Sequence, residues 1–151
     1  MPFTRDFIHP LLIDDINVAY EFHVYDPFVF THQNASWVES NRGVFSVYPD
    51  EKNGFNKDYL EKCFTKYLTF GKDNNVPVYL GEFGAIVYGF QDDRGGDRWI
   101  KDVLDICRRH NINFNYHTYH ETAFGLYMNG AHEYPDKLNT ALYDAFKEAL
   151  R

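Results

Sequence analysis

The stretch Val76-Pro-Val-Tyr-Leu-Gly-Glu-Phe-Gly84 decides the fold class of this chain. Residues 76–81 form a short apolar run between two turn signals, which is typical of a strand buried on both faces. Pro77 stands near the start of the run, where the loss of a backbone donor matters least. We therefore expect a buried strand here, with the carboxylate of Glu82 directly after it.

Helices and strands alternate on both sides of this run. Period-two alternation predicts strands over 17–25 and 112–119, and the apolar segment 7–13, interrupted by Pro10, is a candidate fourth strand. Helical spacing of apolar residues predicts helices that run from 55 to 71, from 99 to 110 and from 135 to 149, while the aromatic-rich loop region 26–53 holds a candidate short helix over 35–41. Such alternation implies right-handed βαβ units and parallel strands. We predict an α/β fold of three to four parallel βα units, forming a single domain over 1–151.

The composition excludes several classes of partner. A formal net charge of −7 without a Lys/Arg cluster argues against binding to nucleic acid or to an anionic membrane surface. No signal peptide and no apolar run of roughly 20 residues is visible, so we expect this chain to be soluble and without a targeting segment. Cys63 and Cys107 each fall in a predicted amphipathic helix, which favours buried free thiols over a disulfide. The aromatic fraction of 19% is typical either of a dense core or of a carbohydrate site.

Candidate functional side chains follow the predicted strands, because functional groups of parallel α/β folds gather at the C-terminal strand ends. Glu82 lies between Gly81 and Gly84, which would let the backbone turn sharply and aim the carboxylate into a pocket; the alternative is a solvated strand-end glutamate. His23, which on its own could be a hydrogen-bonded interior histidine, shares a strand face with Tyr25. The third strand end presents His117, Tyr119, His120 and Glu121.

Three motifs stand at these strand ends: Tyr20-Glu-Phe-His-Val-Tyr-Asp-Pro-Phe-Val-Phe-Thr-His-Gln33, Tyr79-Leu-Gly-Glu-Phe-Gly84, and Phe114-Asn-Tyr-His117 with Phe124-Gly-Leu-Tyr127. Together they resemble the sixth, seventh and eighth strands of glycoside hydrolase family 5, and the resemblance covers nearly all of 17–151. It implies part of a TIM-type (β/α)8 barrel that cleaves β-linked glucans or mannans with retention of configuration. It implies no cofactor and no metal ion, and an extracellular location.

The resemblance also assigns roles to individual residues. It implies that Glu82 is the nucleophile that forms the glycosyl-enzyme, while His23 and Tyr25 line the subsite of the cleaved sugar and the Tyr25 hydroxyl orients Glu82. The partner is then a β-linked oligo- or polysaccharide. The residues expected to contact it are His117, Tyr119, Phe28 and Trp37.

The chain departs from the family pattern at three points. The family supplies its acid/base carboxyl from an Asn-Glu pair at the end of strand four, and this chain contains no such pair. A whole barrel needs about 250 residues, so we expect only its last three-eighths here. His117 stands where the family usually has a tryptophan floor under the sugar.

Several interpretations therefore stay open. In the first, another chain completes the barrel: either a complement chain, or a second copy in a homodimer whose Glu121 would face Glu82 as acid/base in trans, which requires the candidate strand at 7–13. In the second, the chain is an inactive carbohydrate-binding or self-associating remnant whose loop 28–37 contacts the glycan. A metal site at His117, His120 and Glu121 lacks the convergent ligands that zinc needs. Asn34-Ala-Ser36 fits a glycosylation sequon, which matters only in a secreted eukaryotic protein.

Overall fold

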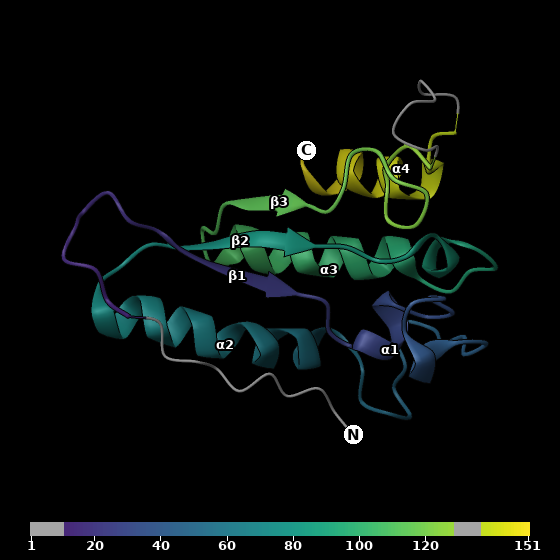
Figure 1. Cartoon of the computed structure of the whole chain (residues 1–151), viewed down its shortest axis with the longest axis horizontal. Helices are drawn as coiled ribbons and strands as arrows, with labels where there is room; N and C mark the ends of the chain where they lie inside the picture. The colour runs from purple at the N-terminus through teal and green to yellow at the C-terminus, as the bar shows by residue number, and fades with distance from the viewer. Residues whose placement is uncertain (1–10, 129–136) are drawn as a thin grey trace.

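The computed structural model describes residues 11–128 and 137–151. In this part of the chain three parallel strands form one sheet in the order β1-β2-β3, namely β1 (Tyr20–Val24), β2 (Val78–Phe83) and β3 (Phe114–Tyr116). Helix α2 (Lys57–Asn74) joins β1 to β2, α3 (Gly96–Arg109) joins β2 to β3, and α4 (Thr140–Ala149) follows (Figure 1). The prediction of an α/β fold with three parallel βα units is confirmed.

Short helices mark the connections that lead away from the sheet. The long loop after β1 contains α1 (Phe28–Thr31) and the 3-10 turn η1 (Glu39–Asn41), and the loop after β2 contains η2 (Val87–Phe90). The helix predicted over 35–41 is therefore wrong except for its last turn. Pro27 precedes α1, and its restricted φ suits the entry into a helix.

The outer strands are shorter than the alternating pattern predicts. Residues 17–19 lie outside β1, and β3 ends at Tyr116, so the prediction over 112–119 is wrong at both ends. Beyond Tyr116 the chain folds back on itself, because the amides of Leu126 and Tyr127 donate to the carbonyls of Thr118 and Tyr119. Of the candidate strand at 7–13, residues 7–10 lie outside the described part, and 11–13 are exposed and not in a strand.

Helix α2 passes through Gly71, where the sequence predicts its end. A Cβ at Gly71 would lie 2.9 Å from a methyl group of Val78, so this glycine allows α2 to pack closely on β2 rather than ending the helix. The helix ends at Asn74, and Asn75 takes the left-handed conformation that often follows a C-terminus. At the other end the Asn56 side chain accepts a 3.2 Å hydrogen bond from the amide of Tyr59.

Helix α4 begins later than predicted. The Asn139 side chain caps it by accepting a 3.2 Å hydrogen bond from the amide of Leu142. Leu138, which we expected inside the helix, instead forms an antiparallel bridge with Tyr127. The predicted start at 135–136 lies outside the described residues.

A bulge in β2 sets the direction of the Glu82 side chain. Along β1, Phe22 pairs with Leu80 but the next residue, His23, pairs with Glu82, so β2 carries one extra residue. Within the predicted run 76–81 only Leu80 is buried, so the prediction of a strand buried on both faces is wrong; the next buried residue of β2 is Phe83, three positions later. A β-bulge bends the strand locally and re-aims its side chains. Here it turns Glu82 away from the helices, on the side of the sheet where His23 lies.

The core fills the space between the sheet and the helices. Its fully buried members include Leu60 and Phe64 from α2, Trp99 and Val103 from α3, and Leu142 from α4. Burial of such side chains from water is the main stabilising contribution to a fold of this size. Cys107 is buried and Cys63 half-buried, and both thiols are free, as predicted. No helix in the described part of the chain is long and apolar enough to cross a membrane.

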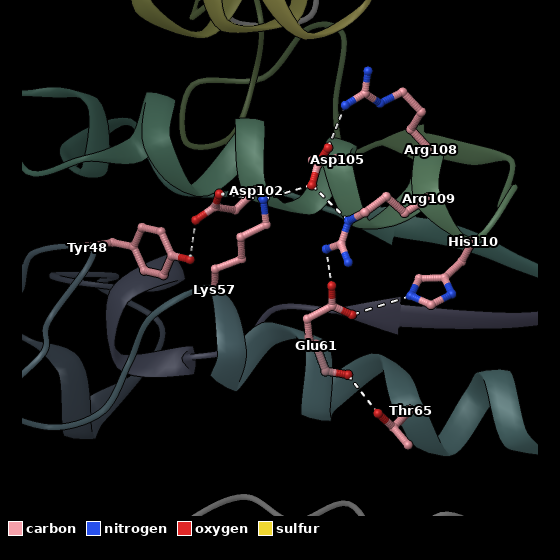
Figure 2. A network of polar contacts seen from close by, with 9 residues as sticks. All are labelled: Tyr48, Lys57, Glu61, Thr65, Asp102, Asp105, Arg108, Arg109 and His110. Carbon is pink, nitrogen blue, oxygen red and sulfur yellow. Dashed lines mark hydrogen bonds and ion pairs between the residues drawn. The ribbon is translucent and has the colours of Figure 1, made fainter.

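An ion-pair network joins α2 to α3 (Figure 2). Asp105 accepts hydrogen bonds from Lys57 at 2.7 Å, Arg108 at 2.6 Å and Arg109 at 2.9 Å. Arg109 also contacts Glu61 on α2. Three cationic partners hold the pKa of Asp105 well below its usual range, with the hydrogen bond from Lys57 as the largest cause. The network fixes one helix against the other on the outside of the sheet.

Candidate active site

The site centres on the carboxylate of Glu82. The Tyr25 hydroxyl donates a 3.0 Å hydrogen bond to Oε2 of Glu82, and Nδ1 of His23 lies 3.4 Å from the same oxygen. The Glu82 side chain keeps 39% of its surface exposed, so the carboxylate is held but open to a ligand. Burial, followed by the Glu82 hydrogen bond and charge, raises the pKa of Tyr25, and the hydroxyl therefore stays a donor.

Glu21 holds the other side of the His23 ring. Its Oε1 lies 2.8 Å from Nε2 of His23, and both side chains are about half exposed. The two contacts, to Glu21 and to Glu82, leave the imidazole little freedom to rotate. His23 thus lies between two carboxylates on the open face of the sheet.

The two glycines around Glu82 provide space rather than a sharp turn. A Cβ on Gly81 would lie 1.9 Å from Oε1 of Glu21, and a Cβ on Gly84 would lie 2.4 Å from the carbonyl oxygen of His117. Neither glycine takes a positive φ. The expectation that they allow a sharp turn is wrong; Gly81 leaves room for the Glu21 side chain, and Gly84 leaves room for the backbone of His117, just after β3.

Buried amides hold the loop after β1 in place. The Gln33 side chain is fully buried, donates to the carbonyl of Phe30 at 3.0 Å and accepts from the amide of Ser46 at 3.2 Å. Asn41 is also buried and donates to the carbonyl of His32 at 3.0 Å. Paired amides of this kind fix irregular backbone without leaving buried polar groups unsatisfied. The hydrogen bonds of Gln33 and Asn41 hold α1 and the residues after it at the edge of the site.

His32 is a site residue that the sequence reasoning missed. Its ring centroid lies 5.2 Å from that of Tyr25 and 4.0 Å from that of Phe28, and its Nδ1 lies 3.0 Å from the Thr31 hydroxyl. The Thr31 hydroxyl donates to the carbonyl of Tyr25 at 2.5 Å, so Nδ1 of His32 is the donor to Thr31. Burial, and then the charge of His117, lowers the pKa of His32 to about 4. The imidazole is therefore neutral near pH 7.

Phe124 forms an apolar floor that the sequence reasoning also missed. It is buried, and its ring centroid lies 5.1 Å from that of His32, 5.9 Å from that of His117, 6.1 Å from that of Tyr25 and 6.3 Å from that of Trp37. The Tyr116 hydroxyl donates to the Phe124 carbonyl at 2.9 Å and ties this floor to β3. The position of Phe124 inside the Phe-Gly-Leu-Tyr motif was the available signal.

The other predicted residues fall into two groups. Trp37, with 58% of its surface exposed, and Phe28, with 37%, lie beside Phe124 and His32. Tyr119 is 62% exposed and packs on Tyr127, with a centroid distance of 5.2 Å. The structure thus brings Trp37 and Phe28 to the Glu82 side of the molecule, whereas Tyr119 packs within its own loop.

His117 and Glu121 lie together after β3. Nε2 of His117 is 3.5 Å from Oε2 of Glu121, and each side chain is 42% exposed. The ring centroid of His117 lies 5.9 Å from that of Phe124, which also borders Tyr25, so the His117–Glu121 pair lies on the Glu82 side of the fold. In residues 11–128 and 137–151 no three His, Cys, Asp or Glu side chains are grouped as a metal site requires.

The sequence of this chain is similar to a known family model and to known proteins. The family model described as cellulase, glycosyl hydrolase family 5, matches residues 4–122. Endoglucanase C of Acetivibrio thermocellus is 29% identical over 140 residues, which cover 76% of this chain and 40% of that protein. Cellodextrinase A of Ruminococcus flavefaciens is 29% identical over 105 residues. This chain therefore spans about two fifths of the length of Endoglucanase C.

Solved structures agree with the sequence comparison. Cel5A of Thermotoga maritima, in complex with a mannotriose substrate, superposes with a TM-score of 0.73 at 25% identity over 90% of this chain and 41% of that protein. A hyperthermophilic endo-β-1,4-glucanase in complex with substrate gives a TM-score of 0.70 at 30% identity over 91% of this chain and 42% of that protein. The three βα units thus form part of a TIM-type (β/α) barrel.

Proposed function

Because this chain belongs to the cellulase family, glycosyl hydrolase family 5, we propose that it carries the nucleophile half of a retaining β-glycanase site. Glu82 is the proposed nucleophile, and its substrate is a β-1,4-linked glucan or a β-linked mannan. The single domain over 1–151 that we expect from the sequence would then be the C-terminal part of the barrel.

The hydrogen bond from Tyr25 to Glu82 is the observation that carries this proposal. A carboxylate nucleophile must keep one oxygen free and aimed while the other is held. Tyr25 and His23 both contact Oε2, which leaves Oε1 for attack on the anomeric carbon. The half-exposed carboxylate gives a sugar access to that oxygen.

The proposed reaction proceeds in two displacements. A Glu82 oxygen bonds to the anomeric carbon while the bond to the leaving oxygen breaks, and a carboxylic acid gives that oxygen a proton. Water then attacks the glycosyl-enzyme, loses its proton to the same group, and frees Glu82. Retaining sites hold the two carboxyl groups about 5 Å apart. The acid/base partner supplied by the family's Asn-Glu pair is absent from this sequence.

We further propose that another chain completes the barrel and supplies this carboxyl. In the described part of the chain the sheet ends at β1 and β3, each with one unpaired edge. Open edges of a parallel sheet need cover from a partner. A complement chain, or a second copy in a homodimer with Glu121 as acid/base in trans, would provide both cover and carboxyl.

The exposed aromatic residues provide surfaces on which a sugar ring would pack. The faces of Trp37 and Phe28 flank the His32–Phe124 pair, and sugar C–H faces pack on aromatic rings. His117 would contact sugar hydroxyls, and so would Tyr119 in the loop after β3. Cel5A of Thermotoga maritima binds a mannotriose substrate, which supports a β-linked oligosaccharide as ligand here.

The missing acid/base motivates a second candidate function. Loss of one member of a catalytic pair costs several orders of magnitude in rate. The chain would then bind β-glycan through the Trp37 loop, or associate with itself, without cleaving a bond.

A hydrolysis assay separates the two functions. Soluble β-1,4-glucan and mannan are incubated with the wild-type chain and with Glu82→Gln, and reducing ends are counted. Activity that Glu82→Gln abolishes supports the hydrolase, whereas binding without release of reducing ends supports the second candidate. Activity that survives Glu82→Gln would overturn the proposed nucleophile. Sedimentation of the same samples tests the assembly, and a monomer with full activity would contradict it.

A further inference from the structure

The His117–Glu121 pair lies beside Glu82, and the reaction described above assigns Glu121 no role toward the Glu82 of its own chain. The amide of His117 donates a 2.9 Å hydrogen bond to the carbonyl of Phe83, the residue after Glu82. The carbonyl of His117 lies against Gly84 so closely that no Cβ would fit. The backbone of His117 is therefore fixed to the strand end that carries the nucleophile candidate.

The loop that presents Glu121 is closed by its own hydrogen bonds. The amide of Glu121 donates to the carbonyl of Tyr127 at 3.1 Å, and the amide of Gly125 donates to the carbonyl of Glu121 at 3.0 Å. A Cβ at Gly125 would lie 2.3 Å from both of these carbonyl oxygens. A carboxylate on such a backbone loses little conformational freedom when a ligand binds.

The His117–Glu121 ion pair contributes too little to the stability of the fold to explain why these two residues are paired. Both side chains are 42% exposed, and exposed ion pairs contribute about 0–1 kcal/mol. An ionised carboxylate has about four acceptor positions, and the 3.5 Å contact with His117 occupies one of them. The half-exposed Glu121 carboxylate is therefore accessible to a ligand.

The surroundings of the pair match those of a sugar. Phe124 supplies an apolar floor under His117, and Tyr25 with Glu82 supplies hydroxyl and carboxylate groups on the neighbouring strands. The ring centroids of His117 and Tyr25 lie 5.9 Å and 6.1 Å from that of Phe124, so the His117–Glu121 pair and the Tyr25–Glu82 pair border the same apolar ring. An apolar base with a polar rim lets a sugar rest its C–H face below and pair its hydroxyls at the sides.

We propose that His117 and Glu121 form a polar subsite that binds adjacent hydroxyl groups of the β-linked sugar next to Glu82. This subsite rests on the proposed function, since it names residues that recognise the same substrate. A carboxylate accepts from two neighbouring hydroxyls at once, and Nε2 of His117 keeps the Glu121 carboxylate oriented toward them. Recognition here depends on hydroxyl positions, whereas a flat aromatic ring recognises mainly the C–H face. Glu121 is then a specificity-determining residue within its own chain.

Titration with cellotriose, followed by amide NMR signals, tests the subsite. Glu121→Gln is expected to weaken cellotriose binding about tenfold or more, because a hydrogen bond to a charged acceptor is lost. Glu148→Gln on α4 is the matched control, since it also removes a carboxylate from an exposed ion pair, with Lys101 at 2.6 Å. The affinity of Glu148→Gln for cellotriose is expected to equal that of the wild type. Equal affinity of the wild type and Glu121→Gln would overturn the subsite, and so would a wild-type chain that does not bind cellotriose.

A second pair of variants tests whether the two residues act together. In a His117→Trp background an aromatic face replaces the imidazole, and Glu121→Gln is expected to cost less than about twofold in affinity. An equal cost in both backgrounds would show that Glu121 acts without His117 and would overturn the paired subsite.

The subsite and the hydrolase can fail separately. If cellotriose binding depends on Glu121 but no bond is cleaved, the proposed hydrolase is contradicted and the subsite is supported. If the chain cleaves substrate but Glu121→Gln binds cellotriose as tightly as the wild type, the subsite is contradicted and the hydrolase is not.

Discussion

The Tyr25 hydroxyl donates a 3.0 Å hydrogen bond to Oε2 of Glu82, joining residues that are 57 positions apart in the chain. The bulge in β2 makes this contact possible, because it moves Glu82 opposite His23 at the end of β1. The geometry at the proposed nucleophile thus depends on one extra residue in a strand.

Removal of the Tyr25 hydroxyl tests its effect on Glu82. Tyr25→Phe keeps the ring beside Phe124 and His32 but removes the donor, and hydrogen bonds to charged groups contribute about 1.5–3 kcal/mol. We expect the rate at which Glu82 reacts with an activated 2-fluoro glycoside to fall about 10- to 100-fold. Because the same hydrogen bond stabilises the folded chain, the thermal midpoint should also fall by a few degrees. An unchanged labelling rate would show that Tyr25 does not orient the carboxylate.

The two glycines around Glu82 should differ in their tolerance of alanine. At Gly84 a Cβ meets the His117 backbone, which cannot move alone, so we expect Gly84→Ala to destabilise the fold by about 2–3 kcal/mol. At Gly81 it meets the end of the flexible Glu21 side chain, and we expect a cost below about 1 kcal/mol. Urea unfolding of both variants measures this difference. Equal costs would contradict the close approach of the His117 backbone to Gly84.

The network between α2 and α3 should show an acid-dependent contribution to stability. Asp105→Asn removes three charged contacts, and we expect a loss of about 1–2 kcal/mol at pH 7. The folded-state pKa of Asp105 is lowered, so its contribution is present above the unfolded value of about 3.9 and is lost as pH falls further. The stability difference from the wild type should therefore shrink below about pH 4.

Asp97→Asn serves as control for this comparison, because Asp97 makes a single 3.9 Å contact with Lys101. We expect it to change stability by no more than a few tenths of a kcal/mol at any pH. If Asp105→Asn behaves like Asp97→Asn in urea unfolding at pH 7, the network does not join the two helices energetically.

His32 should make the fold less stable in mild acid. The folded-state pKa of His32 is lowered to about 4, whereas a histidine in the unfolded chain titrates near 6.5. The stabilising contribution of neutral His32 is complete above about pH 6.5 and is lost as pH falls toward 4, because the unfolded chain takes up the proton first. We expect the thermal midpoint of the wild type to fall more over this range than that of His32→Gln. Parallel pH profiles would contradict a buried, neutral His32.

The helices and the presence of the three strands could be predicted from the sequence because both depend on local periodicity. The bulge at Gly81 and Glu82 could not, since it depends on how β1 and β3 pair with β2. Gly71 misled the prediction of the end of α2 because a glycine required for packing has the same local appearance as one that ends a helix.

Part of the site was visible in the sequence for similar reasons. His23, Tyr25 and Glu82 stand at strand ends, where periodicity locates them. His32 and Phe124 come from loops whose paths depend on buried amides such as Gln33 and on hydrogen bonds between distant backbone groups. No periodic pattern records those contacts, so the sequence alone did not bring these two rings together.

Covalent trapping of Glu82 tests the central claim most directly. 2,4-Dinitrophenyl 2-deoxy-2-fluoro-β-cellobioside has a leaving group that needs no proton, so its reaction requires the nucleophile but not the missing acid/base. Intact mass and peptide mapping after incubation should show one added 2-fluorocellobiosyl group, located on Glu82, and none in Glu82→Gln. An unmodified wild-type chain, or a label on another residue, would contradict the assignment of Glu82 as the nucleophile.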